Sequence, residues 1–249
     1  MSELGAGVLL WCVFALLTAG TVKGILGIGV PVVSVSMLSL VIDVSMAVAL
    51  LPIPIVLANL YQSLFGGQLV STFKRFGPMI LAVVVGTFAG ARMLVEIDQR
   101  TLIGIVGVSV LLFAVTAYFP RHMQLGARGE RWLGVPVGLL GGVLGGMTTF
   151  FGPPLIMFLF ALNLQKDEFV GTISTVYLCA GVPLALGLGM FGVMGPQDYL
   201  WSTAAAVPIF LGVLTGQWMR TRISQTVFRN GLLLMMVVVG IRLIFRALA

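Results

Sequence analysis

Charged residues are scarce in this sequence. Only 9% of its 249 residues are charged, whereas 59% are hydrophobic; a soluble domain has roughly 25% charged residues. A soluble fold of this size could not bury so much apolar side-chain surface. The low charge therefore excludes an ordinary soluble globular protein.

The residues that carry most enzyme chemistry are few or unsuitably placed. The single histidine, His122, lies in a polar stretch, and no acidic residue lies deep within an apolar segment. Neither a carboxylate proton relay nor a cation site is therefore visible. The sequence also lacks a nucleophile elbow, a zinc-binding helix motif and a phosphate-binding loop. We predict that the protein is not an enzyme and uses no metal and no cofactor.

Cysteines and clustered basic charge are also lacking. Cys12 and Cys179 both sit within apolar runs, which suits small core side chains better than a disulfide or a metal ligand pair. The net charge of +6 is scattered over short loops rather than gathered in one patch. We predict no nucleic-acid partner.

What the sequence has in abundance is long apolar segments. Several reach the ~20 residues that cross ~30 Å of hydrocarbon, and lipid allows only helices or closed barrels to span it. Barrel strands are shorter and alternate, so we predict an all-α integral membrane protein in a lipid bilayer. The first segment, 4–22, has the length of a signal peptide. The residue before it is the acidic Glu3, however, and no basic residue precedes it, so we interpret it as a membrane span.

Two copies of one unit follow each other along the chain. Gly24-Ile-Leu-Gly27 recurs as Gly142-Val-Leu-Gly145, and the later pair Gly86 and Gly90 recurs, in the same order, as Gly212 and Gly216. Duplicated helical bundles are typical of transporters. We predict a first transmembrane repeat at 1–120, a connecting cytoplasmic loop at 121–131 and a second transmembrane repeat at 132–249.

Each repeat contains five apolar segments, ten in all. They are 4–22, 24–42, 44–65, 76–95 and 101–120 in the first repeat, and 132–148, 153–165, 169–193, 199–219 and about 226–247 in the second. The apolar parts of the second segments, 32–42 and 155–164, are too short to span alone. We interpret them as broken or re-entrant helices, which leaves about eight full spans.

The distribution of basic residues predicts the topology. With the N-terminus outside and all ten segments changing side, the inner loops collect most Lys and Arg, as the positive-inside rule requires. An odd number of segments per repeat makes the two repeats inverted, which is the arrangement that alternating access uses. The predicted inner residues are Lys23, Lys74, Arg75, Arg121, Arg128, Arg131, Lys166, Arg220 and Arg222.

Paired glycine and proline breaks, at 23–31 and 141–154, are the best candidates for a site. Glycine permits unusual backbone conformations and proline removes a donor, so both interrupt a helix. Freed backbone groups at membrane depth are tolerated only against protein or a water-filled cavity. A helix that restarts after such a break points its amide N–H groups at that cavity and favours an anion. The alternative is that these glycines only let helices pack closely.

Polar residues near the breaks have two interpretations each. Lys23 either neutralises a bound anion or extends to the inner interface, and Arg92 is expected to pair with Glu96. Asn59 and Gln62 either line a pathway or join helices by hydrogen bonds. The predicted substrate-binding residues are Lys23, Gly24, Gly27, Gly29, Val30, Pro31, Asn59, Gln62, Gly145, Thr148, Thr149, Gly152, Pro153 and Pro154.

At these breaks the chain resembles the sulfite exporter TauE/SafE family, also known as toluene-sulfonate uptake permeases. The resemblance rests on the Gly24–Pro31 and Gly142–Pro154 elements and on a Gly-x-x-x-Gly-x-x-Met pattern at 86–93 and 212–219, with Val30 in place of a usual glycine. It implies about eight spans from a duplicated half. It also implies export or uptake of sulfite, sulfoacetate or related organic anions through the cytoplasmic membrane of a bacterium.

Two function classes follow from the sequence. The first is a secondary transporter of a small anion, most simply sulfite or an organosulfonate, which works by alternating access at a site between the two breaks. The alternative is a non-transporting membrane subunit that packs against a partner protein, for which the glycines are packing surfaces. The sequence leaves the oligomeric state open, a homodimer included.

Overall fold

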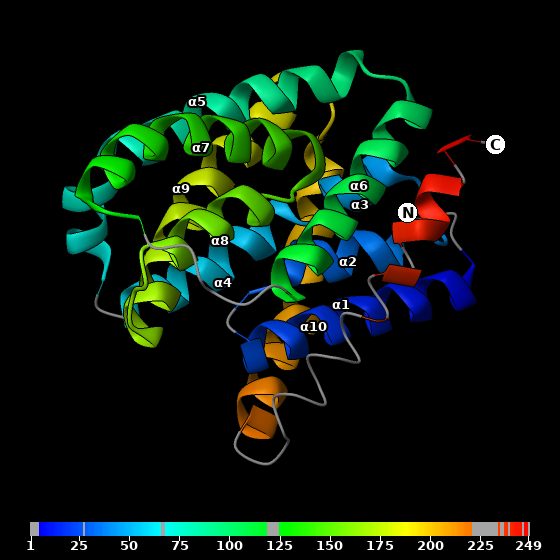
Figure 1. Ribbon diagram of the computed structural model, residues 1–249. Helices are drawn as coiled ribbons and strands as arrows, with labels where there is room; N and C mark the ends of the chain where they lie inside the picture. The colour runs from blue at the N-terminus through cyan, green and yellow to red at the C-terminus, as the bar shows by residue number, and fades with distance from the viewer. Residues whose placement is uncertain are drawn as a thin grey trace. The chain divides into compact units, whose positions relative to one another are not determined.

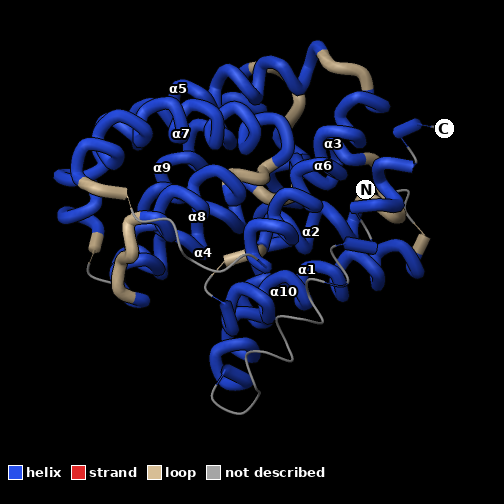
Figure 2. The backbone as a smooth tube through the Cα atoms, viewed as in Figure 1, coloured by secondary structure: helices blue, strands red, loops and turns tan. Residues whose placement is uncertain are grey.

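The computed structural model describes residues 5–26, 28–65, 68–118 and 125–220, together with 234, 237–238, 240–245 and 247–248. Every regular element in these residues is an α-helix (Figures 1 and 2). The predicted last segment, 226–247, and residues 121–124 of the predicted loop lie largely or wholly outside them. The helices are α1 (Ala6–Leu26), α2 (Val30–Leu38), α3 (Val44–Ala49), α4 (Pro52–Phe65), α5 (Leu69–Glu96), α6 (Gln99–Tyr118), α7 (Ala127–Thr148), α8 (Gly152–Ala161), α9 (Lys166–Met190) and α10 (Pro196–Arg220).

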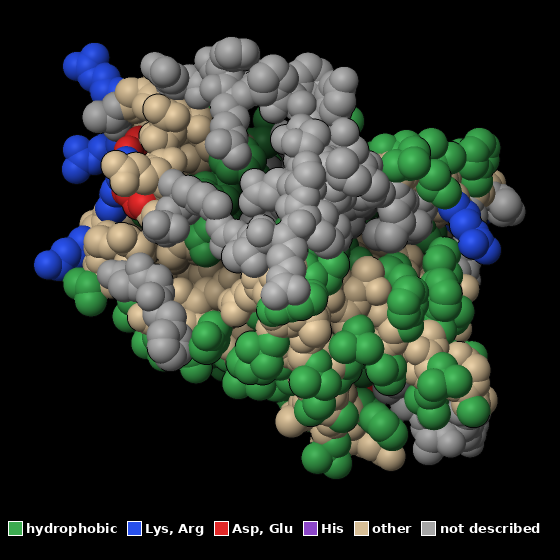
Figure 3. Space-filling model, turned by 90° about the horizontal axis from the view of Figure 1, so that it is seen from below, with side chains coloured by type: hydrophobic (Ala, Val, Ile, Leu, Met, Phe, Trp, Pro, Cys, Tyr) green, Lys and Arg blue, Asp and Glu red, His purple; other side chains and the backbone are tan. Residues whose placement is uncertain are grey.

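Five candidate membrane spans occur in the described part of the chain. By length and composition they are Ala6–Ile25, Val44–Leu64, Leu69–Glu96, Glu168–Met190 and Pro196–Met219. Many large apolar side chains on these helices face outward, as lipid-facing positions do; Figure 3 shows them spread over the face it presents. The predicted all-α membrane protein is confirmed, while the count of eight full spans stays a prediction.

The helices form two compact units, each of which takes segments from both predicted repeats. One unit contains Met1–Pro54, Ile97–Ala117 and Met194–Ala249, and the other contains Ile55–Glu96 and Tyr118–Val193. We call them unit 1 and unit 2. The helix of the first segment of each repeat thus packs against the helix of the fourth segment of the other repeat, α1 with α10 in unit 1 and α7 with α5 in unit 2.

Glycines set the crossing of α1 and α10 in unit 1. A Cβ atom added to Gly20 would lie 3.0 Å from the Gly212 Cα, and one added to Gly24 would lie 2.8 Å from the Gly216 Cα. Only glycine lets two helix backbones approach so closely. Since the earlier glycine of α1 meets the earlier glycine of α10, the two helices run in the same direction.

The same crossing recurs in unit 2 between α5 and α7. A Cβ added to Gly86 would lie 3.1 Å from the Gly142 Cα, and one added to Gly90 would lie 3.0 Å from the Gly146 Cα. Gly86 and Gly90 match Gly212 and Gly216 in the sequence repeat, whereas the crossing is shifted by one turn on the other helix, because Gly24 matches Gly142 but meets Gly216. Each unit therefore contains one close glycine crossing between the first segment of one repeat and the fourth segment of the other.

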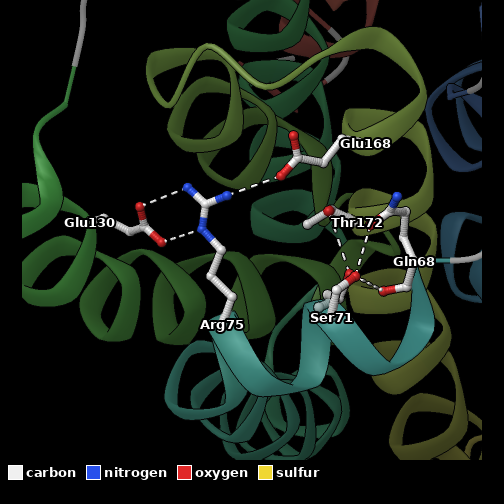
Figure 4. Close-up of polar contacts among 7 residues, drawn as sticks. Gln68, Ser71, Arg75, Glu130, Glu168 and Thr172 are labelled. Atoms are coloured by element: carbon white, nitrogen blue, oxygen red, sulfur yellow. Dashed lines mark hydrogen bonds and ion pairs between the residues drawn. The ribbon is translucent and has the colours of Figure 1, made fainter.

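Helices α5, α7 and α9 of unit 2 begin at the same end. Arg75 at the start of α5 makes two hydrogen bonds to Glu130 of α7, from Nε at 2.7 Å and from Nη2 at 2.9 Å. Its Nη1 donates to Glu168 of α9 at 3.0 Å (Figure 4). Further along, Gly187 of α9 lies against Ala91 of α5. The three helices therefore run in parallel.

Helix α8 runs back along α7 to that end. Gly141 faces Leu155, Gly134 faces Phe158, and the Leu125 N–H donates to the Ala161 carbonyl at 2.8 Å. Helix α8 ends near the start of α7, and α9 begins at that same end. Helices α7 and α8 together therefore do not make a single interrupted crossing of the membrane. In unit 1, the Trp11 Nε1 donates to the Met37 carbonyl at 3.0 Å, so α2 returns along α1 in the same way.

Two local features explain where helices begin. The predicted fourth segment starts at 76, where α5 bends: Phe76 has non-helical backbone angles and Pro78 lies inside the helix. Before α6, the Asp98 carboxylate accepts hydrogen bonds from the Thr101 hydroxyl and amide, which lower the pKa of Asp98 and cap the helix.

Candidate functional site

The first break is shorter than the sequence predicts. Helix α1 continues through Lys23 and Gly24 to Leu26, and α2 begins at Val30. The break therefore comprises residues 27–29, of which Gly27 lies outside the described residues. Gly29 has φ 114°, a left-handed conformation that glycine adopts without strain, and a Cβ there would lie 3.0 Å from the Val22 side chain.

The start of α2 is buried and keeps its first-turn amides. Val30 is 2% exposed and Pro31 is buried too. No side-chain hydrogen bond caps this helix. Pro31 has no N–H, so the amides of Val30 and Val32 are the donors of the first turn. The predicted anion site at a helix start requires backbone N–H donors of this kind.

Gly24 belongs to helix packing rather than to the break. It lies inside α1 and faces the backbone of α10 at Val213 and Gly216. Gly145 likewise lies inside α7, where an added Cβ would overlap the ring of Phe151. These contacts are what the packing interpretation expects for the two glycines, and a role in substrate binding stays a prediction.

The second break has the same length as the first but different chemistry. It comprises residues 149–151 between α7 and α8, and its left-handed residue is Thr149, with φ 64°. Pro153 and Pro154 have no N–H, so Gly152 is the only residue of the first three in α8 that carries an amide donor. The two helix starts are therefore not equivalent, because the first three residues of α2 carry two amide donors and those of α8 carry one.

The hydroxyls of Thr148 and Thr149 are turned to the backbone. Thr148 donates to the Leu144 carbonyl at 2.6 Å and accepts from the Phe150 N–H at 3.1 Å. Thr149 donates to the Thr148 carbonyl at 2.6 Å. Both threonines were predicted to bind the substrate, but in this structure their hydroxyls donate to backbone carbonyls at the end of α7.

Lys23 is buried within the protein. Its residue is 3% exposed, in the last turn of α1 and next to Val22, which contacts Gly29. A lysine that extends to the membrane interface keeps its ammonium group exposed to water. The burial therefore argues against the interpretation in which Lys23 extends to the inner interface.

A match to a known family covers almost all of these features. The model of the sulfite exporter TauE/SafE family matches residues 12–243, which include both breaks and both glycine crossings. This chain belongs to the sulfite exporter TauE/SafE family. No curated protein and no solved structure matches it.

Membership of the TauE/SafE family establishes the broad class of the protein. The family is one of membrane transporters of sulfite or related anions and not of enzymes. Together with its several long apolar helices, membership makes this chain a multi-pass membrane protein. The resemblance found in the sequence is thereby confirmed.

Gln62 of this TauE/SafE chain joins two helices within unit 2, whereas the hydrogen bond of Asn59 stays within its own helix. Asn59 donates to the Ile55 carbonyl of its own helix at 2.8 Å, and the Gln62 Oε1 accepts from Ser174 of α9 at 3.0 Å. Beside them, the Ser63 and Thr175 hydroxyls lie 2.8 Å apart. Gln62 and Ser63 of α4 thus form a polar contact with Ser174 and Thr175 of α9, as the helix-joining interpretation predicts for Gln62.

The predicted site residues divide between the two units. Lys23, Gly24, Gly29, Val30 and Pro31 lie in unit 1. The others that are described, from Asn59 to Pro154, lie in unit 2. That the two breaks face each other stays a prediction.

Two groups of polar residues were not predicted from the sequence. Ser34 and Ser36 interrupt the supposedly apolar stretch 32–42, and they were identifiable as the polar residues of α2. The Arg75, Glu130 and Glu168 cluster was missed because its members are distant in sequence; Figure 4 shows them converging. The expected Arg92–Glu96 pair is present, with an N–O distance of 2.9 Å.

Proposed function

We propose that this protein is a secondary transporter that moves sulfite or an organosulfonate across the cytoplasmic membrane of a bacterium. The observation that carries the proposal is the family match over residues 12–243 together with a buried, uncapped helix start at the first break. Membership supplies the transported class, and the break supplies a place where an anion meets amide N–H groups.

The charge around the first break supports an anion rather than a cation. Lys23 is buried at the end of α1, and the sequences of α1 and α2, which flank the break, contain no acidic residue. A cation site within a membrane needs carboxylates or clustered carbonyl oxygens. A positive side chain beside uncapped amides instead attracts an oxyanion.

Inverted repeats, and with them alternating access, are part of the proposal. Helices α4 and α9 come from the matched third segments of the two repeats, and they run in opposite directions: Gln62 and Ser63 meet Ser174 and Thr175, whereas Ile55 meets Gly181. Opposite directions of matched segments are what an inverted repeat requires. In such a fold, exchanging the conformations of the two repeats opens the site to the other side.

The glycine crossings weigh against the partner-docking alternative. That hypothesis needs the glycine faces to be offered to another protein. In this structure the glycines at the two crossings, which belong to α1, α5, α7 and α10, pack against one another within the chain. A homodimer stays a prediction, which the mass of the purified protein in detergent tests.

Flux into proteoliposomes tests the proposal. Purified protein in sealed vesicles is expected to take up labelled sulfite or sulfoacetate with saturable kinetics, whereas protein-free vesicles of the same lipid are not. Competition within a panel of small anions would rank the substrates. An absence of saturable uptake for every anion in the panel, in either direction of the gradient, would contradict the proposed function.

A further inference from the structure

Two buried hydroxyls in α2 have no partner. Ser34 and Ser36 are both 0% exposed, and neither Oγ makes a hydrogen bond to any described residue. Buried hydroxyls are nearly always hydrogen-bonded, because burial without a partner is costly. In helices a serine commonly donates to the carbonyl four residues earlier, yet neither does so here. The free hydroxyls therefore need an explanation.

Ser34 is placed to serve the first break. It follows Val30, the first residue of α2, by one helical turn, so the two residues share a face. Side chains on a helix lean toward its N-terminus and cover the preceding turn. The Ser34 hydroxyl is therefore directed toward the turn that carries the uncapped amides of Val30 and Val32. Ser36 lies about 200° around the helix axis from Ser34 and further from the break.

The second break has no equivalent donor set. In the repeat alignment of Gly29-Val30-Pro31 with Gly152-Pro153-Pro154, the position of Ser34 corresponds to Met157. Prolines stand where Val30 and Pro31 stand in the first repeat, and the Thr148 and Thr149 hydroxyls donate to carbonyls. Among the described residues, the first turn of α2 thus offers more backbone donors than that of α8, in which Gly152 alone of the first three residues has an amide N–H.

We propose that the Ser34 hydroxyl and the amides of Val30 and Val32 form an oxyanion subsite at the first break. The subsite holds an oxygen of sulfite or of a sulfonate group, and Lys23, buried in the last turn of α1 just before the break, is the nearest basic residue in sequence. This proposal rests on the proposed function, since it takes the transported anion as its ligand. It differs from a symmetric site because one repeat supplies the donors.

The chemistry of the subsite selects an oxyanion. Amide N–H groups and a hydroxyl donate hydrogen bonds, and α2 contributes no carboxylate that would repel an anion. A hydroxyl also tolerates a partly protonated oxyanion, because its oxygen accepts a hydrogen bond. A few neutral donors bind an anion less tightly than a cluster of arginines would, which suits a transporter that has to release its substrate.

Ser34→Ala and Ser36→Ala form a matched pair for the test. Each removes one buried, unpartnered hydroxyl from the same helix, so each should leave stability without ligand unchanged or higher. Thermal unfolding in detergent, with and without sulfite, measures binding. Sulfite should raise the unfolding temperature of the wild type and of Ser36→Ala. In Ser34→Ala the affinity should fall roughly ten- to a hundredfold, as expected for a lost hydrogen bond to a charged group.

Sulfite flux in proteoliposomes separates this inference from the proposed function. A raised KM in Ser34→Ala, with Ser36→Ala within about twofold of the wild type, supports the subsite. Uptake that is equal in Ser34→Ala, Ser36→Ala and wild type overturns the subsite and leaves the transport function standing. Sulfite binding that depends on Ser34 without any uptake supports the subsite and contradicts the transport function. An absence of sulfite-induced stabilisation in the wild type overturns the subsite.

Discussion

Ser63 and Thr175 bring their hydroxyl oxygens within 2.8 Å of each other at the contact between α4 and α9. Both residues are fully buried, and they belong to the matched third segments of the two repeats. Further along the same contact, Gly181 of α9 lies against Ile55 and Val56 of α4. The matched segments therefore pack antiparallel, which is the contact that the inverted-repeat proposal uses.

Labelling of single cysteines tests the inversion. Asp43 precedes the third segment of the first repeat, and Gln165 precedes that of the second; both are exposed. In a variant without Cys12 and Cys179, Asp43→Cys should react with a membrane-impermeant thiol reagent added outside cells. Gln165→Cys should react only after permeabilisation, because Lys166 marks the inner side. Reaction of both positions from the same side would exclude inverted repeats.

Alanine at a crossing glycine should destabilise the protein. Gly24→Ala places a Cβ against the α10 backbone, where no flexible side chain can yield. We expect a loss of about 1–3 kcal/mol, as for other overpacked sites. Gly7 of the same helix has nothing within 4 Å of an added Cβ. Gly7→Ala should therefore be neutral or up to about 1 kcal/mol stabilising, through helix propensity.

Denaturation in detergent compares these two variants directly. Gly146→Ala of α7 repeats the test in unit 2, since its Cβ would lie 2.9 Å from the Gly90 Cα. If Gly24→Ala and Gly7→Ala unfold alike, the close crossing of α1 and α10 is wrong.

The charge cluster of unit 2 should stabilise the common end of α5, α7 and α9 modestly. Glu130 accepts two hydrogen bonds from Arg75 and its side chain is 21% exposed, whereas Glu168 accepts one and is 35% exposed. Glu130→Gln should therefore cost more than Glu168→Gln, about 1 kcal/mol or less in each case. The matched control is Glu96→Gln, because the Arg92–Glu96 pair is 57% and 62% exposed.

Unfolding temperatures at low and high salt measure these differences. The cost of Glu130→Gln should shrink at high salt, as screening weakens partly exposed pairs. A cost for Glu96→Gln equal to that of Glu130→Gln would show that the cluster adds nothing beyond a surface ion pair.

The sequence predicted the helices, the repeat and the glycine positions because composition and spacing carry them. It could not decide whether a given glycine ends a helix or packs one. Gly24 looked like part of a break, but its partner, Gly216, is distant in sequence and only the tertiary contact reveals it. That each unit combines segments of both repeats could not be predicted for the same reason.

The two breaks looked equivalent in sequence but differ in donors. The loss of two amide donors at Pro153 and Pro154 is predictable from the sequence, because proline has no backbone N–H. The direction of the Thr148 and Thr149 hydroxyls was not, because it depends on how α7 ends. The free hydroxyl of Ser34 also required the structure, since a helical serine more often bonds to its own backbone.

The central claim is that the anion passes the first break, whose geometry depends on Gly29. Gly29 and Gly192 both have positive φ, 114° and 76°, but only Gly29 adjoins the start of α2. Alanine at either position imposes left-handed strain, about 1–2 kcal/mol. A Cβ at Gly29 would also lie 3.0 Å from the Val22 side chain, whereas nothing lies within 4 Å of one at Gly192, so Gly29→Ala should lose somewhat more stability than Gly192→Ala.

Sulfite uptake by proteoliposomes that contain wild type, Gly29→Ala or Gly192→Ala is the most direct measurement. We expect saturable uptake by the wild type and by Gly192→Ala, and little or none by folded Gly29→Ala. Uptake by Gly29→Ala equal to that of Gly192→Ala would contradict the account.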